Sequence, residues 1–329
     1  MNFLMEKLHH VLDNIHPFHI FLSLFNIVVF VVAGTVIYFV STRQRRLVGS
    51  RHGVFGFLVP IREWLSLSAL TDLSIYAVTK SGVLGVALAS NVALGLVAAG
   101  LIQDLLTFLC GARPAGLPGG GILLTAGLLA FICRDFMNFY IHYLEHKVPL
   151  LWEFHKVHHS AASLNPLTAN RFHPVQIQLD ALAEGFGLGL VYGVFGYFYR
   201  ITAVDIAFLL VNIGWVVQLL ILEPLQHSHV PLSFGRLDDY VYSPRMHQIH
   251  HSAIEAHWDR NFGSTITLWD RLFACYYKPV EGEAVEIGLD AQKHLAYRTI
   301  LHCYLLPFLG CYRILTGTAG REGAVADPA

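Results

Sequence analysis

Residues 142–159 read HYLEHKVPLLWEFHKVHH and hold five histidines in two spaced motifs. His142 and His146 are four residues apart, and His155, His158 and His159 form an HxxHH motif. Residues three or four apart share one face of a helix, so this spacing aims several imidazoles at the same volume. Because histidine is the commonest side-chain ligand of metals, the stretch predicts a metal site.

Further histidines follow in three short motifs: His173 in RFHP, a pair in QHSH and a second HxxHH in PRMHQIHH. A single histidine on an apolar helix is usually a packed residue with one hydrogen bond. Clusters with ligand spacing are instead typical of metal sites. We therefore predict a metal-binding role for eleven of the nineteen histidines: His142, His146, His155, His158, His159, His173, His227, His229, His247, His250 and His251.

The composition is that of an integral membrane protein. Hydrophobic residues make up 54% of the 329 residues and charged residues 14%, and the mean hydropathy is +0.51. Such values favour a membrane class over two soluble domains. The net charge of −1 and the lack of basic patches with interleaved aromatics argue against a nucleic-acid partner. The five cysteines form no CxxC motif, and we expect them to be reduced.

Apolar segments predict an all-α, polytopic membrane bundle. About twenty apolar residues are needed to cross the bilayer, and we expect crossings at 18–40, 83–109 and 121–141, with a hairpin at 175–200 and 203–222. Residues 64–80 are shorter and contain Asp72, so they predict an interfacial or half-buried helix. Residues 295–316 carry interspersed charges and predict an amphipathic helix on the membrane surface, although for both segments a crossing stays open.

Arginines after the first apolar segment, at 43, 45, 46 and 51, indicate the cytoplasmic side. If residues 64–80 do not cross, the count of crossings also places the histidine motifs in the cytoplasm. The polar residues 223–294 would then form a cytoplasmic, histidine-rich cap over the metal site. We expect three regions: an N-terminal anchor (1–120), a catalytic domain (121–294) and a C-terminal amphipathic helix and tail (295–329).

The motif order HxxxH, HxxHH, HxxHH resembles the membrane-bound fatty acid hydroxylase and sterol desaturase superfamily. Four longer stretches carry the same resemblance, which covers about residues 125–277: LWEFHKVHHS (151–160), NRFHP (170–174), YSPRMHQIHHS (242–252) and NFGSTITLWDRLF (261–273). Of the QHSH pair, His227 matches the family position, whereas many members carry Asn where this chain has His229.

The resemblance implies a dinuclear iron centre with histidine ligands, which uses O2 to hydroxylate or desaturate a C–H bond of a lipid. The lipid would be a fatty acyl, sphingoid, ether-lipid or sterol molecule, and zinc can replace iron in a purified sample. Eight histidines of the three motifs would form the catalytic centre: His142, His146, His155, His158, His159, His247, His250 and His251. The sequence shows no fused redox module, so we expect a separate electron-transfer protein of cytochrome b5 or ferredoxin type.

Two other classes of function stay open at this point: a metal transporter and a non-catalytic metal-binding membrane protein. A transporter would place histidines and carboxylates along its spans near the midplane, whereas here they gather at span ends and in a polar segment.

Individual residues also have two readings. Asp135 would orient an imidazole or pair with Arg134, and Asp270 would pair with an arginine. His173 would be a ligand, a partner that orients a ligand, or the structural end of a loop, because Pro174 favours extended geometry before it.

Overall fold

The structure is a computed structural model, and it describes residues 28–39, 53–114, 116–201, 222–289 and 294–318. Across these ranges the chain is mostly helical, and β-structure is limited to isolated bridges. Three helices are long and apolar enough to cross a membrane: Leu67–Cys110, Gly120–Lys147 and Pro174–Phe198. The predicted all-α membrane bundle with a histidine-rich cap is confirmed.

The first of these helices differs from the two separate segments expected at 64–80 and 83–109. Helix α4 (Leu67–Val78) continues through the π-helical turn η1 (Thr79–Val83) into α5 (Leu84–Cys110). Gly82 marks the kink between them. One face of α4 is buried, including Asp72 and Ile75, so the segment is half-buried as expected, and the non-helical backbone of Gly82 separates it from α5 by a kink.

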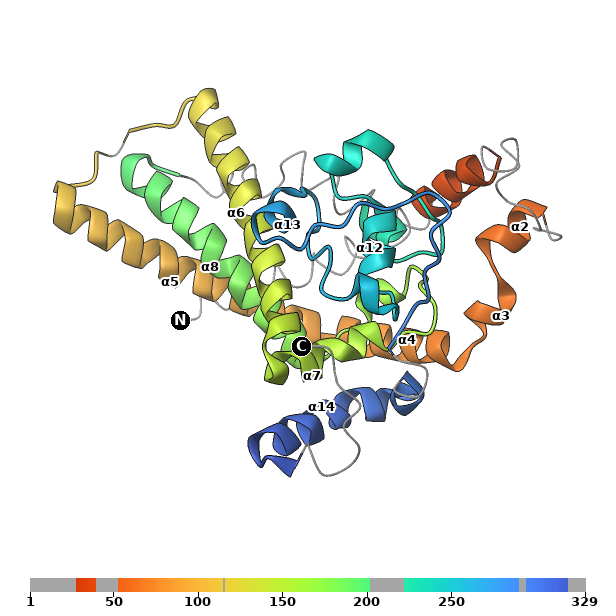
Figure 1. Cartoon of the computed structure of the whole chain (residues 1–329). Coiled ribbons are helices and arrows are strands. Elements are labelled where there is room, and N and C mark those ends of the chain that lie inside the picture. The colour runs from red at the N-terminus through yellow and green to blue at the C-terminus, as the bar shows by residue number, and fades with distance from the viewer. Residues whose placement is uncertain (1–27, 40–52, 115, 202–221, 290–293, 319–329) are drawn as a thin grey trace.

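Glycines allow α5 and α8 (Pro174–Phe198) to approach closely. Gly185, Gly189 and Gly193 recur every four residues along α8 and form a small-residue stripe. A Cβ on Gly185 or Gly189 would clash with the backbone of α5. Small residues at such spacing let helices in membranes pack closely. Helix α6 (Gly120–Lys147) lies beside this pair, and Figure 1 shows the three helices together on one side of the molecule.

A cap of short helices lies at the other side, and α7 (Pro149–His159) connects to it from the end of α6. Both helices with an HxxHH motif, α7 and α12 (Pro244–His250), begin with proline, which suits the first helical position because no N–H is needed there. The other short elements are α2 (Gly53–Leu58), α3 (Ile61–Trp64), η2 (Thr168–Asn170), α11 (Glu223–Gln226), η4 (Gly235–Asp239), η5 (Glu255–His257), α13 (Leu268–Leu272) and η6 (His294–Tyr297).

The last helix, α14 (Ile300–Leu315), packs beneath α7 (Figure 1). Thr299 caps its N-terminus by accepting a hydrogen bond from the N–H of His302 at 3.3 Å. With 16 residues it is shorter than a typical crossing. Its position on a membrane surface stays a prediction.

Two expected segments lie partly outside the described residues. Within 18–40, a helix is described for Val28–Phe39. Of the hairpin, the first arm is α8, whereas 202–221 lies outside the described part of the chain.

Candidate metal centre

Nine of the eleven predicted histidines come together in two adjacent groups. In each group the candidate ligand atoms lie within 4.8 Å of one another. Group one contains His142, His146, His155, His159 and His250. Group two contains His158, His227, His247 and His251.

Helical spacing divides each HxxHH motif between the two groups. On α7, His155 and His159 are one turn apart and both belong to group one, whereas His158 turns toward group two. On α12 the division is reversed, because His247 and His251 belong to group two and His250 to group one. The two helices therefore build a double site in which each contributes to both halves.

The partners of two group-one imidazoles determine which nitrogen carries the proton. His142 Nδ1 lies 2.9 Å from the carbonyl oxygen of Phe262, and His155 Nδ1 lies 2.9 Å from Glu145 Oε2. The Phe262 carbonyl accepts, so His142 Nδ1 donates and its Nε2 keeps its lone pair. The Glu145 carboxylate accepts from His155 Nδ1 in the same way, in competition with the Gln176 amide group, which lies against the same nitrogen. These two Nε2 atoms nevertheless face each other at 3.1 Å. Two lone pairs at this distance repel unless a cation lies against both.

His250 and His146 extend the same arrangement. His250 Nδ1 lies 3.0 Å from the carbonyl of Arg260, so this nitrogen also donates. The buried Nε2 atoms of His250 and His146 have no hydrogen-bond partner among the described residues. Two ligand atoms each about 2.1 Å from one metal ion, at right angles, lie about 3 Å apart. Group one therefore has the donor chemistry and spacing that fit a transition metal.

In group two the same contacts between Nε2 atoms recur. His247 Nε2 lies 2.9 Å from that of His227 and 3.0 Å from that of His251, and His227 Nε2 lies 3.2 Å from that of His158. Here, however, the Nδ1 atoms of His158, His247 and His251 have no partner among the described residues. Packing replaces hydrogen bonding, since Phe172 stacks on His158 with ring centroids 4.4 Å apart.

Burial keeps these imidazoles neutral, which is the form that binds metals. The pKa values of the histidines on α7 and α12 lie well below the usual range, first because burial disfavours the charged ring and second because neighbouring imidazoles repel it. Burial likewise lowers the pKa of His227 to about 4.

The sequence analysis did not identify two polar residues that support His155. Glu145 and Gln176 are both buried, and Gln176 Nε2 lies 3.1 Å from Glu145 Oε2 and 2.7 Å from His155 Nδ1. A carboxylate that accepts from a ligand histidine fixes the ring and raises its basicity. The only sequence signal was a glutamate beside His146 in an apolar helix end.

His173 and His229 lie outside both groups. His173 Nδ1 accepts the N–H of Val175 at 3.0 Å, and Nε2 donates to the carbonyl of Tyr304 at 3.2 Å. A neutral imidazole with both nitrogens in use has no lone pair left for a metal. His229 Nε2 donates to the carbonyl of Phe57 at 2.6 Å. The position of His173 matches its structural alternative, and His229 contacts neither group, so we leave both out of the proposed ligand set.

The two aspartate expectations are wrong. Asp135 accepts from Ser264 Oγ at 3.1 Å and Trp269 Nε1 at 2.9 Å, whereas Arg134 pairs with Glu184. Asp135 is seven residues before the first histidine motif, and two helical turns of about 10 Å are too far for a hydrogen bond.

Asp270 pairs with no arginine in the described structure. Its carboxylate accepts the backbone N–H groups of Phe262 at 2.7 Å and Gly263 at 3.1 Å. Burial raises its pKa to about 7, although both hydrogen bonds oppose the shift. Asp270 thereby holds the loop whose Phe262 carbonyl orients His142.

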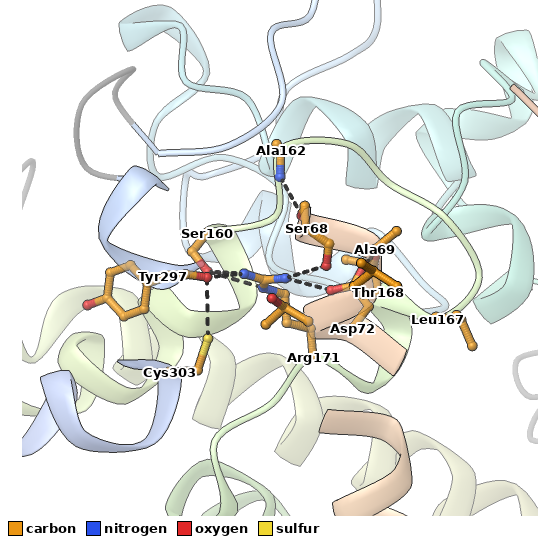
Figure 2. A network of polar contacts seen from close by, with 12 residues as sticks. Ser68, Ala69, Asp72, Ser160, Ala162, Leu167, Thr168, Arg171, Tyr297 and Cys303 are labelled. Carbon is orange, nitrogen blue, oxygen red and sulfur yellow. Dashed lines mark hydrogen bonds and ion pairs between the residues drawn. The ribbon is translucent and has the colours of Figure 1, made fainter. Parts of the chain in front are cut away.

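The arginine of RFHP supports α7 from behind. Arg171 is buried and donates to Asp72 Oδ1 at 2.7 Å, to the carbonyl of Val157 at 3.0 Å and to that of Tyr297 at 3.0 Å. It also donates to Ser160 Oγ. Figure 2 shows the guanidinium between α4, the end of α7 and the segment before α14. Arg171 therefore fixes the end of the helix that supplies both groups.

Fold and site define a membrane protein with a candidate dinuclear metal centre. Residues 127–275 match the sequence model of the family described as fatty acid hydroxylase. Over this part of the chain, the match confirms the resemblance that the histidine motifs carry.

Three curated relatives are similar to about half of the chain. An ornithine lipid hydroxylase of Rhizobium tropici is 27% identical over 169 residues, which are 50% of this chain and 46% of the relative. An alkylglycerol monooxygenase of Homo sapiens is 26% identical over 49% of this chain and 32% of its own length. A Delta(7)-sterol 5(6)-desaturase of Leptosphaeria maculans is 27% identical over 44% and 35%. The match thus spans less than half of each relative, and no solved structure matches the chain.

Proposed function

We propose that this protein oxidises a C–H bond of a membrane lipid with O2, at two iron ions held by groups one and two. The observation that carries the proposal is the pair of adjacent, all-imidazole groups built jointly by α7 and α12. The relatives named above as hydroxylase, monooxygenase and desaturase support the class of reaction.

The donor set favours iron over structural zinc. Structural zinc sites are four-coordinate and usually include cysteine. The five free cysteines contribute to neither group, and group one offers five nitrogens. When bound, two irons would supply the activation of O2, from which one oxygen atom enters the lipid or two hydrogens are removed.

The chain's own residues orient the imidazoles and exclude water. Glu145, with the carbonyls of Phe262 and Arg260, would hold three imidazoles with Nε2 toward the metal. The rings of Phe139 and Phe262 are fully buried beside group one. A dry and rigid site of this kind suits the placement of one unactivated carbon.

The ligands in this proposal are the nine histidines of the two groups. The catalytic domain would be 121–294, between the anchor region and the C-terminal helix. Its metal centre would face the cytoplasm, where a separate electron-transfer protein of cytochrome b5 or ferredoxin type supplies two electrons per turnover. With two protons, these reduce the second oxygen atom of O2 to water during hydroxylation.

Metal analysis combined with O2 uptake tests the proposal. The purified protein is loaded with iron, and metal per chain and O2 consumption on reduction are measured with and without added lipid. We expect two irons per chain and O2 uptake that depends on both iron and lipid. A zinc-loaded sample is the matched control and should consume none. The proposal would be refuted if the iron-loaded protein consumed no O2 when reductant and lipid were added.

A further inference from the structure

An apolar groove lies between α6 and α8, outside both histidine groups. The groove is open along one side and has a volume of about 450 Å³, within the size range of small-molecule sites. Its α6 wall includes Leu129, Ile132 and Phe136, and its α8 wall includes Leu190 and Val194. All lining side chains are aliphatic, aromatic or thiol, so a charged head group would find no partner there.

The groove follows the axes of two helices that can cross a membrane. From Leu129 to Phe136 it extends over seven residues, or about 10 Å of helix. Cys133 Sγ on the α6 wall donates to the carbonyl of Gly187 on α8 at 3.2 Å and marks where the helices meet. Lipid chains in a bilayer run in the same direction, so a single extended chain can lie along this groove.

One end of the groove reaches the cap. Trp269 of α13 lines the cavity and packs edge-on against Phe136, with ring centroids 5.0 Å apart. Trp269 and Phe136 in turn pack against the core of Phe139 and Phe262, and the carbonyl of Phe262 orients His142. The inner end of the groove thus lies against the aromatic core of Phe139 and Phe262, which borders group one.

We propose that this groove binds the hydrocarbon chain of the lipid substrate, tail toward the bilayer and polar head toward the cap. The substrate is then a lipid with a flexible acyl or alkyl chain. His142 lies six residues beyond Phe136, about 9 Å along α6. The oxidised carbon therefore lies nearer the head group than the end of the tail. The assignment of the chain as substrate rests on the proposed function.

Photolabelling tests the groove without turnover. Metal-free protein in phosphatidylcholine vesicles is irradiated with a long-chain fatty acid that carries a mid-chain diazirine, and the labelled residues are mapped by mass spectrometry. We expect labelling of 129–136 and 190–195 to exceed that of more exposed residues on α5, such as Leu96 and Leu101, which are each 66% exposed. Unlabelled fatty acid should compete, and cholesterol should not.

Two neighbouring leucines supply matched variants. Leu129 lines the groove and is 44% exposed, whereas Leu128 is 56% exposed and lies outside the lining. Leu129→Trp should reduce groove labelling about tenfold, because the larger indole ring fills the space that the chain would occupy. Leu128→Trp should leave it unchanged. Even labelling of groove and α5, equal losses in both variants, or displacement by cholesterol alone would overturn the proposal.

The outcomes also separate this inference from the proposed function. If the groove is labelled as expected but the protein shows no iron-dependent oxidation, the proposed function is refuted, whereas binding of a hydrocarbon chain in the groove is supported. If Leu129→Trp oxidises lipid at the parent rate in an iron-dependent reaction, the proposed function is supported and the groove is refuted as the binding site of the substrate chain.

Discussion

Groups one and two contain the same chemistry but are supported in different ways. In group one, three imidazoles donate from Nδ1 to Glu145 and to the carbonyls of Phe262 and Arg260. In group two, three Nδ1 atoms have no partner among the described residues, and ring packing holds the histidines instead. Acceptors fix a ring's tautomer and direction, so we expect group one to be the more pre-organised half.

The largest effect should come from removing one ligand of each group. His250→Ala and His247→Ala alter the same helix, α12, but different groups. Each should reduce the metal content toward one ion per chain and abolish turnover, because both halves of a dinuclear site are needed. Metal analysis with a lipid oxidation assay measures both quantities. Two ions and normal turnover in either variant would remove that histidine from the ligand set.

These two variants also isolate the groups. His247→Ala leaves group one for measurement, and His250→Ala leaves group two. We expect the remaining ion to bind more tightly in the His247→Ala protein, because its histidines start with fixed tautomers. Equal affinities would mean that the Nδ1 acceptors contribute little.

Loss of Arg171 should affect both groups alike, since it holds the end of α7 that supplies both. Arg171→Leu leaves Asp72 buried without its cation, and such a change costs about 3–5 kcal/mol. Unfolding in detergent with metal analysis of the folded fraction provides the measurement. Arg271→Ala is the control, because the Arg271–Asp239 pair is exposed to solvent and such surface pairs contribute little to stability. Metal loss confined to one group would contradict the shared role.

The division of the HxxHH motifs shows how far the sequence predicts this site. Helical spacing alone puts His155, His158 and His159 within one broad face of α7. The spacing thus predicts that histidines converge, but which groups they join depends on how α7 faces α12. Metal binding itself stays a prediction, whereas the helical fold is confirmed and the family resemblance is confirmed over residues 127–275.

The side-chain partners that the sequence did not predict are contacts between segments far apart in the chain. Asp72 and Arg171 are 99 residues apart, and Asp135 meets Trp269 across 134 residues. No local pattern encodes such pairs. The direct connection of α4 to α5 through η1 was also missed, since the expectation left residues 81–82 as a gap without describing the kink at Gly82.

Removing the acceptor of His155 should have an intermediate effect. We expect Glu145→Ala to weaken metal binding to group one by about 10–100-fold, the usual cost of losing such a partner. The effect should be seen in the His247→Ala background and not in the His250→Ala background. Glu145→Gln is the matched variant, because its amide oxygen can still accept from Nδ1, and it should recover part of the affinity. Equal losses in both backgrounds would show a general structural role.

The smallest effect should come from Asp259, which tests whether every group-one histidine needs an acceptor. Its Oδ1 lies 3.9 Å from His146 Nδ1, too far for a hydrogen bond, and its other oxygen contacts Lys147. Asp259 has φ of 58°, a left-handed conformation that asparagine also adopts readily. Asp259→Asn should therefore preserve the backbone and change metal affinity by less than about threefold, well under the 10–100-fold range of a direct partner. Metal titration in the His247→Ala background measures the change. A loss of tenfold or more would mean that Asp259 moves into contact with His146 when metal binds, so that group one is completed by the metal.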